Sequence, residues 1–129
     1  MLIINRWTLT GRLVKDPGVP RFLPSGEAQL IFSVAFNRPL SGKGVTGKTE
    51  QASFFEVLVR GRYAETISEN LRKGSPVYIE GEAIQLAYPQ TGEAPPKKRI
   101  VLKARTVQFL SAGVDIPAAE DPSGVEIPE

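Results

Sequence analysis

The chain of 129 residues is long enough for one ordinary domain and too short for two. It contains neither cysteine nor histidine, which excludes disulfides, thiolate or Ser-His-Asp catalysis and almost every zinc site. The net charge of +2 hides a division, because residues 111–129 carry five acidic and no basic side chains, leaving 16 basic against nine acidic in residues 1–110, a net of +7. A basic body with an acidic tail suggests a surface that binds a polyanion.

Apolar residues recur at every second position along most of the body, which is typical of half-buried strands. In chain order, the predicted strands are about 7–15, 28–36, 53–60, 76–88 and 99–110. Residues 89–96, rich in proline and glycine, are expected to form a hairpin loop between the last two strands. In the third strand, the even positions from Phe54 to Arg60 share one face, and the odd positions share the other.

The period changes after Arg62, where Tyr63, Ile67 and Leu71 form an apolar stripe with a spacing of four residues. This stripe predicts a short helix that ends before Gly74. The order of elements predicts an all-β protein with one short helix, consistent with a five-stranded oligonucleotide-binding (OB) barrel over residues 1–110, although other small β-barrels fit it too. Residues 111–129, acidic and containing three prolines, are expected to be a disordered tail.

Residues 42–49, with the sequence GKGVTGKT, match the template of nucleotide-binding phosphate loops. Such a loop opens a helix, whose N-terminal amides hold the phosphates. Here the chain continues with the alternation of a strand, and no aliphatic run ending in Asp follows to hold magnesium. The sequence therefore favours a glycine-rich loop between two strands over a nucleotide hydrolase, with Lys43 and Lys48 as candidates for non-specific phosphate contacts.

Glu80 and Glu82 lie two positions apart on one strand, as a pair of catalytic carboxylates might. Glycoside hydrolases need such groups on opposite sides of a cleft, roughly 5–9.5 Å apart, and neighbours on one strand do not enclose a sugar. The favoured interpretation is a solvated strand face. We therefore expect no enzymatic activity, no metal and no cofactor. No apolar stretch approaches the roughly 18 residues of a membrane span, and no cleavable signal is visible, so no membrane contact is expected.

Basic and aromatic residues interleave in several segments of the body. In chain order they are Arg21, Phe22, Phe54, Arg60, Arg62, Tyr88, Lys97, Lys98 and Arg99. A protein that holds a single nucleic-acid strand needs cations along the phosphate path and flat rings on which splayed bases stack. The alternative is that the aromatic rings pack in the core or against a partner, while the cations only keep the surface soluble. Composition alone leaves both interpretations open.

Several segments between Asn5 and about Gly113 resemble the bacterial single-stranded DNA-binding protein family in their order and spacing. They are GRL (11–13), KDP (15–17), RFLPSG (21–26), FFEV (54–57), GRYAE (61–65) and, most specific, LRKGSPVYIEG (71–81). The resemblance implies an OB barrel that assembles into a homotetramer. It also implies sequence-independent coating of single-stranded DNA in replication, recombination and repair, without catalysis, in the cytoplasm and in association with the nucleoid.

The resemblance implies that Phe54 and Tyr88 stack on bases, and that Arg21, Arg62 and Lys73 occupy basic positions of the binding surface. Arg60 stands where the family commonly has an aromatic residue, and its planar guanidinium can also stack on a base. The full set of predicted DNA contacts is Arg6, Arg21, Phe22, Lys43, Lys48, Phe54, Arg60, Arg62, Lys73, Tyr88, Lys97 and Lys98.

The sequence departs from the family pattern at Glu56, Ile84 and Leu86, where basic residues are expected, and a stacking tryptophan near residues 37–40 is absent. These departures predict weaker or more salt-sensitive binding, or a different mode of wrapping. They also favour the alternative of an adaptor resembling the primosomal proteins of the same barrel family. Such proteins are often dimers, and their main role is to bind a helicase or another replication partner.

In the family, an acidic tip ending in Ile-Pro-Phe docks replication and repair proteins. Here residues 115–117 (DIP) and 126–129 (EIPE) echo that tip, and the absence of the terminal phenylalanine argues against such docking. Two interpretations of the tail stay open: it competes with DNA for the basic surface of its own chain, or it is a solvated segment without a function.

Overall fold

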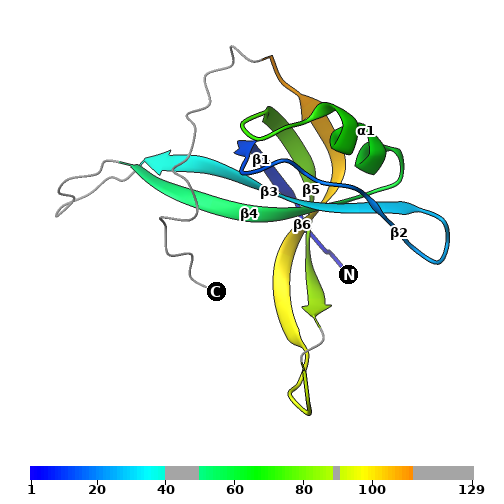
Figure 1. Cartoon of the computed structure of the whole chain (residues 1–129). Helices are drawn as coiled ribbons and strands as arrows, with labels where there is room; N and C mark the ends of the chain where they lie inside the picture. The colour runs from blue at the N-terminus through cyan, green and yellow to red at the C-terminus, as the bar shows by residue number, and fades with distance from the viewer. Residues whose placement is uncertain (40–49, 89–90, 112–129) are drawn as a thin grey trace, which may run out of the picture.

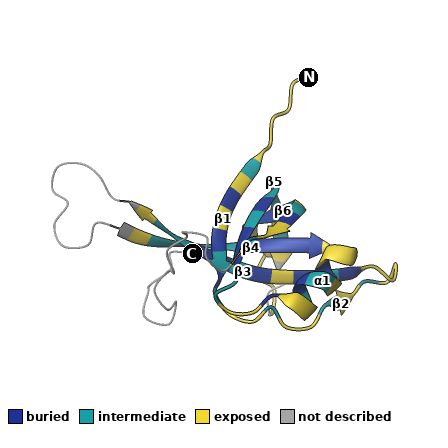
Figure 2. Ribbon diagram, turned by 90° about the horizontal axis from the view of Figure 1, so that it is seen from above, coloured by how far each residue is buried: buried dark blue, intermediate teal, exposed yellow. Residues whose placement is uncertain are grey.

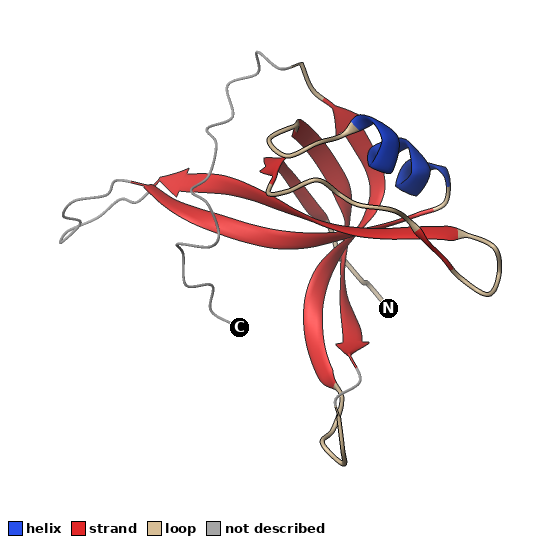
Figure 3. Cartoon of the chain, in the orientation of Figure 1, coloured by secondary structure: helices blue, strands red, loops and turns tan. Residues whose placement is uncertain are grey.

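The computed structural model describes residues 1–39, 50–88 and 91–111 and shows a barrel of strands with one helix (Figure 1). The elements are β1 (Trp7–Leu13), β2 (Arg21–Phe22), β3 (Ala28–Pro39), β4 (Glu50–Arg60), α1 (Arg62–Asn70), β5 (Pro76–Tyr88) and β6 (Lys97–Phe109). Figure 3 shows that strands make up most of the regular structure, and the predicted all-β class with one short helix is confirmed. The two-residue strand β2 is not among the predicted strands. Residues 112–129, almost the whole predicted tail, lie outside the described residues.

The strands form one sheet that closes on itself. β1 pairs with β5, β5 with β6 and β3 with β4, all antiparallel, whereas β4 and β6 are parallel. A further antiparallel pairing of β1 with β3 closes the order β1-β5-β6-β4-β3 into a barrel. The predicted five-stranded barrel is therefore confirmed, and β2 pairs with the first two residues of β3, on the side opposite β4.

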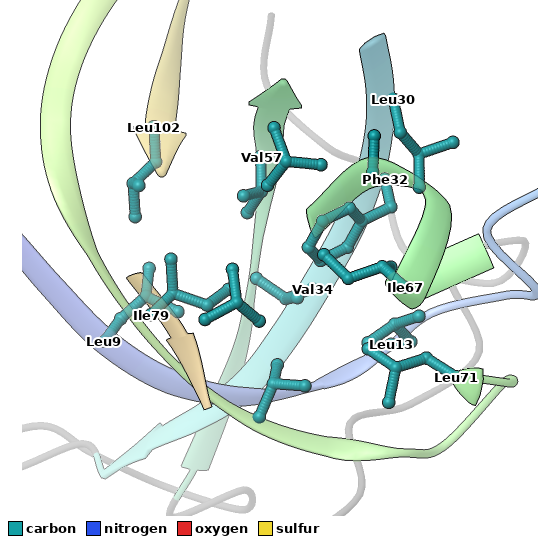
Figure 4. Close-up of a cluster of buried hydrophobic side chains, with 14 of the residues drawn as sticks. Leu9, Leu13, Leu30, Phe32, Val34, Val57, Ile67, Leu71, Ile79 and Leu102 are labelled. Atoms are coloured by element: carbon teal, nitrogen blue, oxygen red, sulfur yellow. The ribbon is translucent and has the colours of Figure 1, made fainter. Parts of the chain in front are cut away.

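The core fills the barrel with side chains from the inward positions of each strand (Figure 4). Those with no exposed surface include Val34, Val57, Val77, Ile79 and Leu102. Helix α1 packs on this core with Ala64, Ile67 and, just after its end, Leu71. The predicted stripe is wrong at Tyr63, which is 40% exposed. Positions 64, 67 and 71 follow the 3.6-residue period of a helix, whereas Tyr63 lies about 100° to one side of Ala64.

Two hairpins extend beyond the barrel in different directions (Figure 1). We call them the β3–β4 arm (residues 33–39 and 50–56) and the β5–β6 arm (residues 82–88 and 97–101). β4 and β6 pair only at Val57 with Leu102 and at Leu58 with Lys103. The arms therefore diverge directly from this short parallel contact.

Asn5 continues the pairing of β1 with β5 through its side chain. Its Nδ2 donates to the carbonyl oxygen of Ala83 at 2.8 Å, and its Oδ1 accepts from the Ala83 amide at 2.9 Å. The side-chain amide thus satisfies the two backbone groups that the next residue pair of a strand would use. Before these two hydrogen bonds, residues 1–4 lie outside the sheet and are at least 75% exposed, and Figure 2 shows this N-terminal segment as exposed.

Replacing Asn5 by alanine should lower the free energy of unfolding by about 1–2 kcal/mol, because two hydrogen bonds that each contribute about 1 kcal/mol are lost. Asn5→Asp keeps the acceptor and removes the donor, so about half of that loss is expected. Urea denaturation followed by circular dichroism measures both values. Equal stability of all three proteins would show that water replaces the two hydrogen bonds at no cost.

Candidate nucleic-acid interface

The outward side of β4 carries Phe54, Glu56, Leu58 and Arg60, while Val57 and Val59 on the inward side are buried in the core. This arrangement follows the predicted alternation, since successive side chains of a strand point to opposite faces. Across the sheet, the same side is continued by Gln29 to Ala35 of β3 at odd positions, and by Lys97 to Lys103 of β6 at odd positions. We call this surface the outer face.

One end of the outer face is cationic. Gln29 pairs with Arg21 of β2 on one side and with Arg60 of β4 on the other, so the three side chains form a row across three strands. The Arg60 Nε donates to Gln29 Oε1 at 3.3 Å. Arg62 follows two residues later in the first turn of α1, and all three arginines are exposed. The strand pairing thus brings together two predicted cations, Arg21 and Arg60, with Arg62 two residues further along the chain, and we call these three arginines the arginine row.

Phe22 does not share this side with Arg21. It pairs with Ala28, whose side chain belongs to the core, whereas Arg21 pairs with Gln29 on the outer face. Phe22 is 62% exposed. The two neighbours in sequence are therefore candidates for contacts on opposite faces of β2.

The two adjacent phenylalanines of β4 are separated in the same way. Phe54 is half-buried on the outer face, opposite Ala35 of β3. Phe55 points inward, where its ring meets Trp7 edge-on at a centroid distance of 5.2 Å and stacks on Phe36 at 5.7 Å. Of the two phenylalanines, Phe54 is therefore the one that the outer face presents, and it stays the predicted stacking residue of β4.

On the β5–β6 arm, Lys97 and Arg99 occupy outward positions, paired with Tyr88 and Leu86, whereas Lys98 lies on the opposite side with Ala87. The three basic side chains are exposed. Arg99 belongs to the interleaved basic residues of the sequence but is not among the predicted DNA contacts. Its signal in the sequence is its place two residues after Lys97, on the same side of the strand. Arg99 forms an ion pair with Glu56 across the gap between the arms, with 3.1 Å between Nη1 and Oε1.

The middle of the outer face is apolar. Leu58 and Val101 have no exposed surface and Ala35 is 3% exposed, although none of the three belongs to the core cluster inside the barrel. Ile84 pairs with Val101 and is half-buried, and Leu86, also half-buried, follows two residues later. We call these five residues the outer apolar floor. Ile84 and Leu86, where the sequence predicts cations, thus lie on this apolar surface, Ile84 paired with a buried valine and Leu86 paired with Arg99.

The remaining predicted contacts lie elsewhere or are not described. Lys73 is in the turn after α1, where its amide donates to Asp16 Oδ1 at 2.8 Å, at the opposite end of the helix from Arg62. Arg6 precedes β1 and lies close enough to Tyr78 for its charge to act on that hydroxyl. Lys43 and Lys48, with the whole GKGVTGKT motif, lie outside the described residues. Only the backbone pairing of Tyr88 is described.

Glu80 is a structural partner of Tyr78, whose hydroxyl donates to Glu80 Oε1 at 2.6 Å. This hydrogen bond is the main cause that raises the pKa of Tyr78, followed by partial loss of hydration and the charge of Glu80, while Arg6 acts in the opposite direction. The hydroxyl therefore stays protonated at neutral pH and keeps donating. Glu82 is exposed and pairs with Lys103, beyond a bulge that separates it from Glu80.

Neither an acidic metal centre nor a membrane-spanning helix is found in the described ranges. No three acidic side chains gather there in a way that could hold a metal ion. Among the described residues, no helix has the length and apolar character needed to cross a membrane.

Comparison with known proteins agrees with this geometry. The model of the single-strand binding protein family matches residues 4–110, which include the barrel, both arms and the outer face. The single-stranded DNA-binding protein of Treponema pallidum (strain Nichols) is 34% identical over 112 residues, covering 87% of this chain and 61% of that protein. The chain thus spans about three fifths of the length of this curated relative. The resemblance predicted from the sequence motifs is confirmed: the chain belongs to the single-strand binding protein family.

Proposed function

We propose that the protein binds single-stranded DNA without sequence preference and without catalysis, and so protects exposed strands in replication, recombination and repair. The observation that carries this proposal is the layout of the outer face. The arginine row lies at one end, Phe54 and the outer apolar floor lie in the middle, and Lys97 and Arg99 lie at the other end. Unstacked bases can rest on the ring and the floor while their phosphates meet the cations.

The physical contrast with duplex DNA supports the single strand as ligand. In a duplex the flat faces of the bases are stacked on one another and are not available to Phe54. Phe54 and Arg60 are six residues apart on β4, about 20 Å at roughly 3.3 Å per residue. A DNA strand that lies along β4 therefore meets cations and apolar surface in succession.

Membership of the family and the name of the Treponema pallidum relative also support the proposal. On the same basis we propose a homotetramer that acts in the cytoplasm in association with the nucleoid. The adaptor alternative is not favoured, because both comparisons point to proteins that bind single strands.

The test is a titration of fluorescein-labelled oligo-dT of graded length, compared with a duplex of equal length. The label is placed on the DNA because Trp7, the only tryptophan, packs against Phe55 on the inner side of β4. Anisotropy should show a clear preference for the single strand, and gel mobility gives the number of chains and nucleotides in each complex. Equal affinity for the duplex would contradict the proposal.

The arginine row should set part of the salt dependence of binding. Each cation that contacts a phosphate contributes a slope of about −0.7 to a plot of log K against log salt for single strands. Arg60→Gln and Arg62→Gln should each flatten the slope by about this amount. Arg38→Gln is the matched control, because Arg38 pairs with Gln51 on the inner side of the β3–β4 arm and should leave the slope unchanged. A slope that changes equally in all three variants would assign the effect to net charge alone.

A further inference from the structure

An ion pair joins the two arms directly beside the point where β4 and β6 stop pairing. Arg99 Nη1 of the β5–β6 arm lies 3.1 Å from Glu56 Oε1 of the β3–β4 arm. The side chains are 47% and 31% exposed, so both are within reach of a ligand that lies between the arms. β4 and β6 pair at Val57 with Leu102 and at Leu58 with Lys103, so Glu56 and Arg99 precede the paired segment and meet through their side chains.

The pair lies on the outer face next to Phe54 and the outer apolar floor. Glu56 is the next outward residue after Phe54 on β4, and Arg99 is the next outward residue before Val101 of the outer apolar floor on β6. A base stacked on Phe54 would therefore bring its phosphate close to the Arg99 guanidinium. The Glu56 carboxylate is negatively charged and lies next to this guanidinium. It therefore attracts the guanidinium and repels a phosphate that approaches it.

We propose that Arg99 is a phosphate-binding residue of the outer face and that Glu56 is its competitor. In the free protein Glu56 holds the guanidinium of Arg99, and a DNA phosphate takes over the guanidinium on binding. An exposed ion pair of this kind is weak, so a phosphate that accepts two parallel hydrogen bonds can replace it. The proposal rests on the proposed function and deepens it.

Glu56 then limits binding in two ways. It must release Arg99 before the phosphate contact forms, and its carboxylate stays near the phosphate, well within the Debye length of about 10 Å at 0.1 M salt. This residue therefore lowers the affinity for single strands and weakens the salt dependence that Arg99 would otherwise contribute. The chain would release DNA more readily than one with a neutral residue at position 56.

The first test is Glu56→Gln, titrated with labelled oligo-dT at several salt concentrations. Binding near 0.1 M salt should tighten about two- to fivefold, which is the range expected for loss of an exposed ion pair. The slope of log K against log salt should steepen by up to about 0.7, because one more phosphate contact forms without competition. Glu69→Gln, an exposed residue of α1, changes the net charge equally and should alter neither quantity.

The second test uses Arg99→Gln and the double variant Glu56→Gln/Arg99→Gln. If Arg99 binds the phosphate, the steeper slope produced by Glu56→Gln should disappear when Arg99 is absent. An equal change with and without Arg99 would overturn the proposal, because Glu56 would then act through its own charge only. Glu56→Ala must reproduce the slope of Glu56→Gln, and cooperative thermal melting of each variant shows that the fold is intact.

The outcomes separate this inference from the proposed function. A wild-type protein with no preference for single strands would contradict the proposed function itself. A wild-type protein that prefers single strands, with Glu56→Gln titrating identically to it, would overturn only the competition between Glu56 and DNA for Arg99.

Discussion

Replacing Phe54 by alanine should weaken the binding of oligo-dT by about 5- to 150-fold, which corresponds to about 1–3 kcal/mol for one stacked base. The ring lies half-buried on the outer face beside Glu56 and opposite the small residue Ala35, so its removal takes away the flat surface without opening the core. Anisotropy titrations at fixed salt measure the loss. The slope of log K against log salt should stay the same, because a stacking contact releases no counterion.

Phe55→Ala is the matched control for Phe54→Ala, since the same side chain is removed one position along the strand. Phe55 packs against Trp7 and Phe36, so its loss should lower the free energy of unfolding by about 2 kcal/mol, less than for a fully buried phenylalanine. Affinity for oligo-dT should remain close to wild type at temperatures where the variant is folded. If Phe54→Ala instead lost stability and kept its affinity, Phe54 would be a packing residue.

The fold could be predicted from the sequence where one face of each strand is buried, because burial imposes an apolar period of two. The predicted strands therefore agree with β1, β3, β4, β5 and β6 to within a few residues. β2 could not be found in this way, because two exposed residues are too short to show a period. The helical stripe was misplaced at Tyr63, since an alanine at position 64 is a weaker signal of burial than an aromatic ring.

The candidate site was harder to predict than the fold, because it depends on which strands lie side by side. Arg21 and Phe22 are neighbours in sequence and lie on opposite faces. The contact of Glu56 with Arg99 spans 43 positions and depends on the parallel pairing of β4 with β6, which leaves no local pattern. The outer apolar floor could not be predicted from a local pattern either, because only the register of the β5–β6 hairpin places Ile84 beside Val101.

Gly81→Ala should destabilise the barrel by about 3 kcal/mol or more, because the added carbon has no room. A Cβ at this position would overlap the carbonyl oxygen of Lys103 and lie 2.8 Å from Leu102 Cδ2. The register of β5 and β6 shifts between Glu80 and Gly81, which leaves Arg105 without a paired residue and brings the two backbones together. Because the overlapping oxygen belongs to the backbone of β6 in the closed barrel, it cannot rotate away as a side chain could.

Gly92→Ala separates this steric effect from backbone strain. Gly92 has a φ of +80° with nothing within 4 Å of a Cβ, so its substitution should cost only about 1–2 kcal/mol. Gly81 does not have a positive φ, and its cost comes from overlap alone. Urea denaturation of both variants measures the difference. If the two variants had equal free energies of unfolding, β5 and β6 would be able to move apart at the bulge, and the steric argument for Gly81 would be wrong.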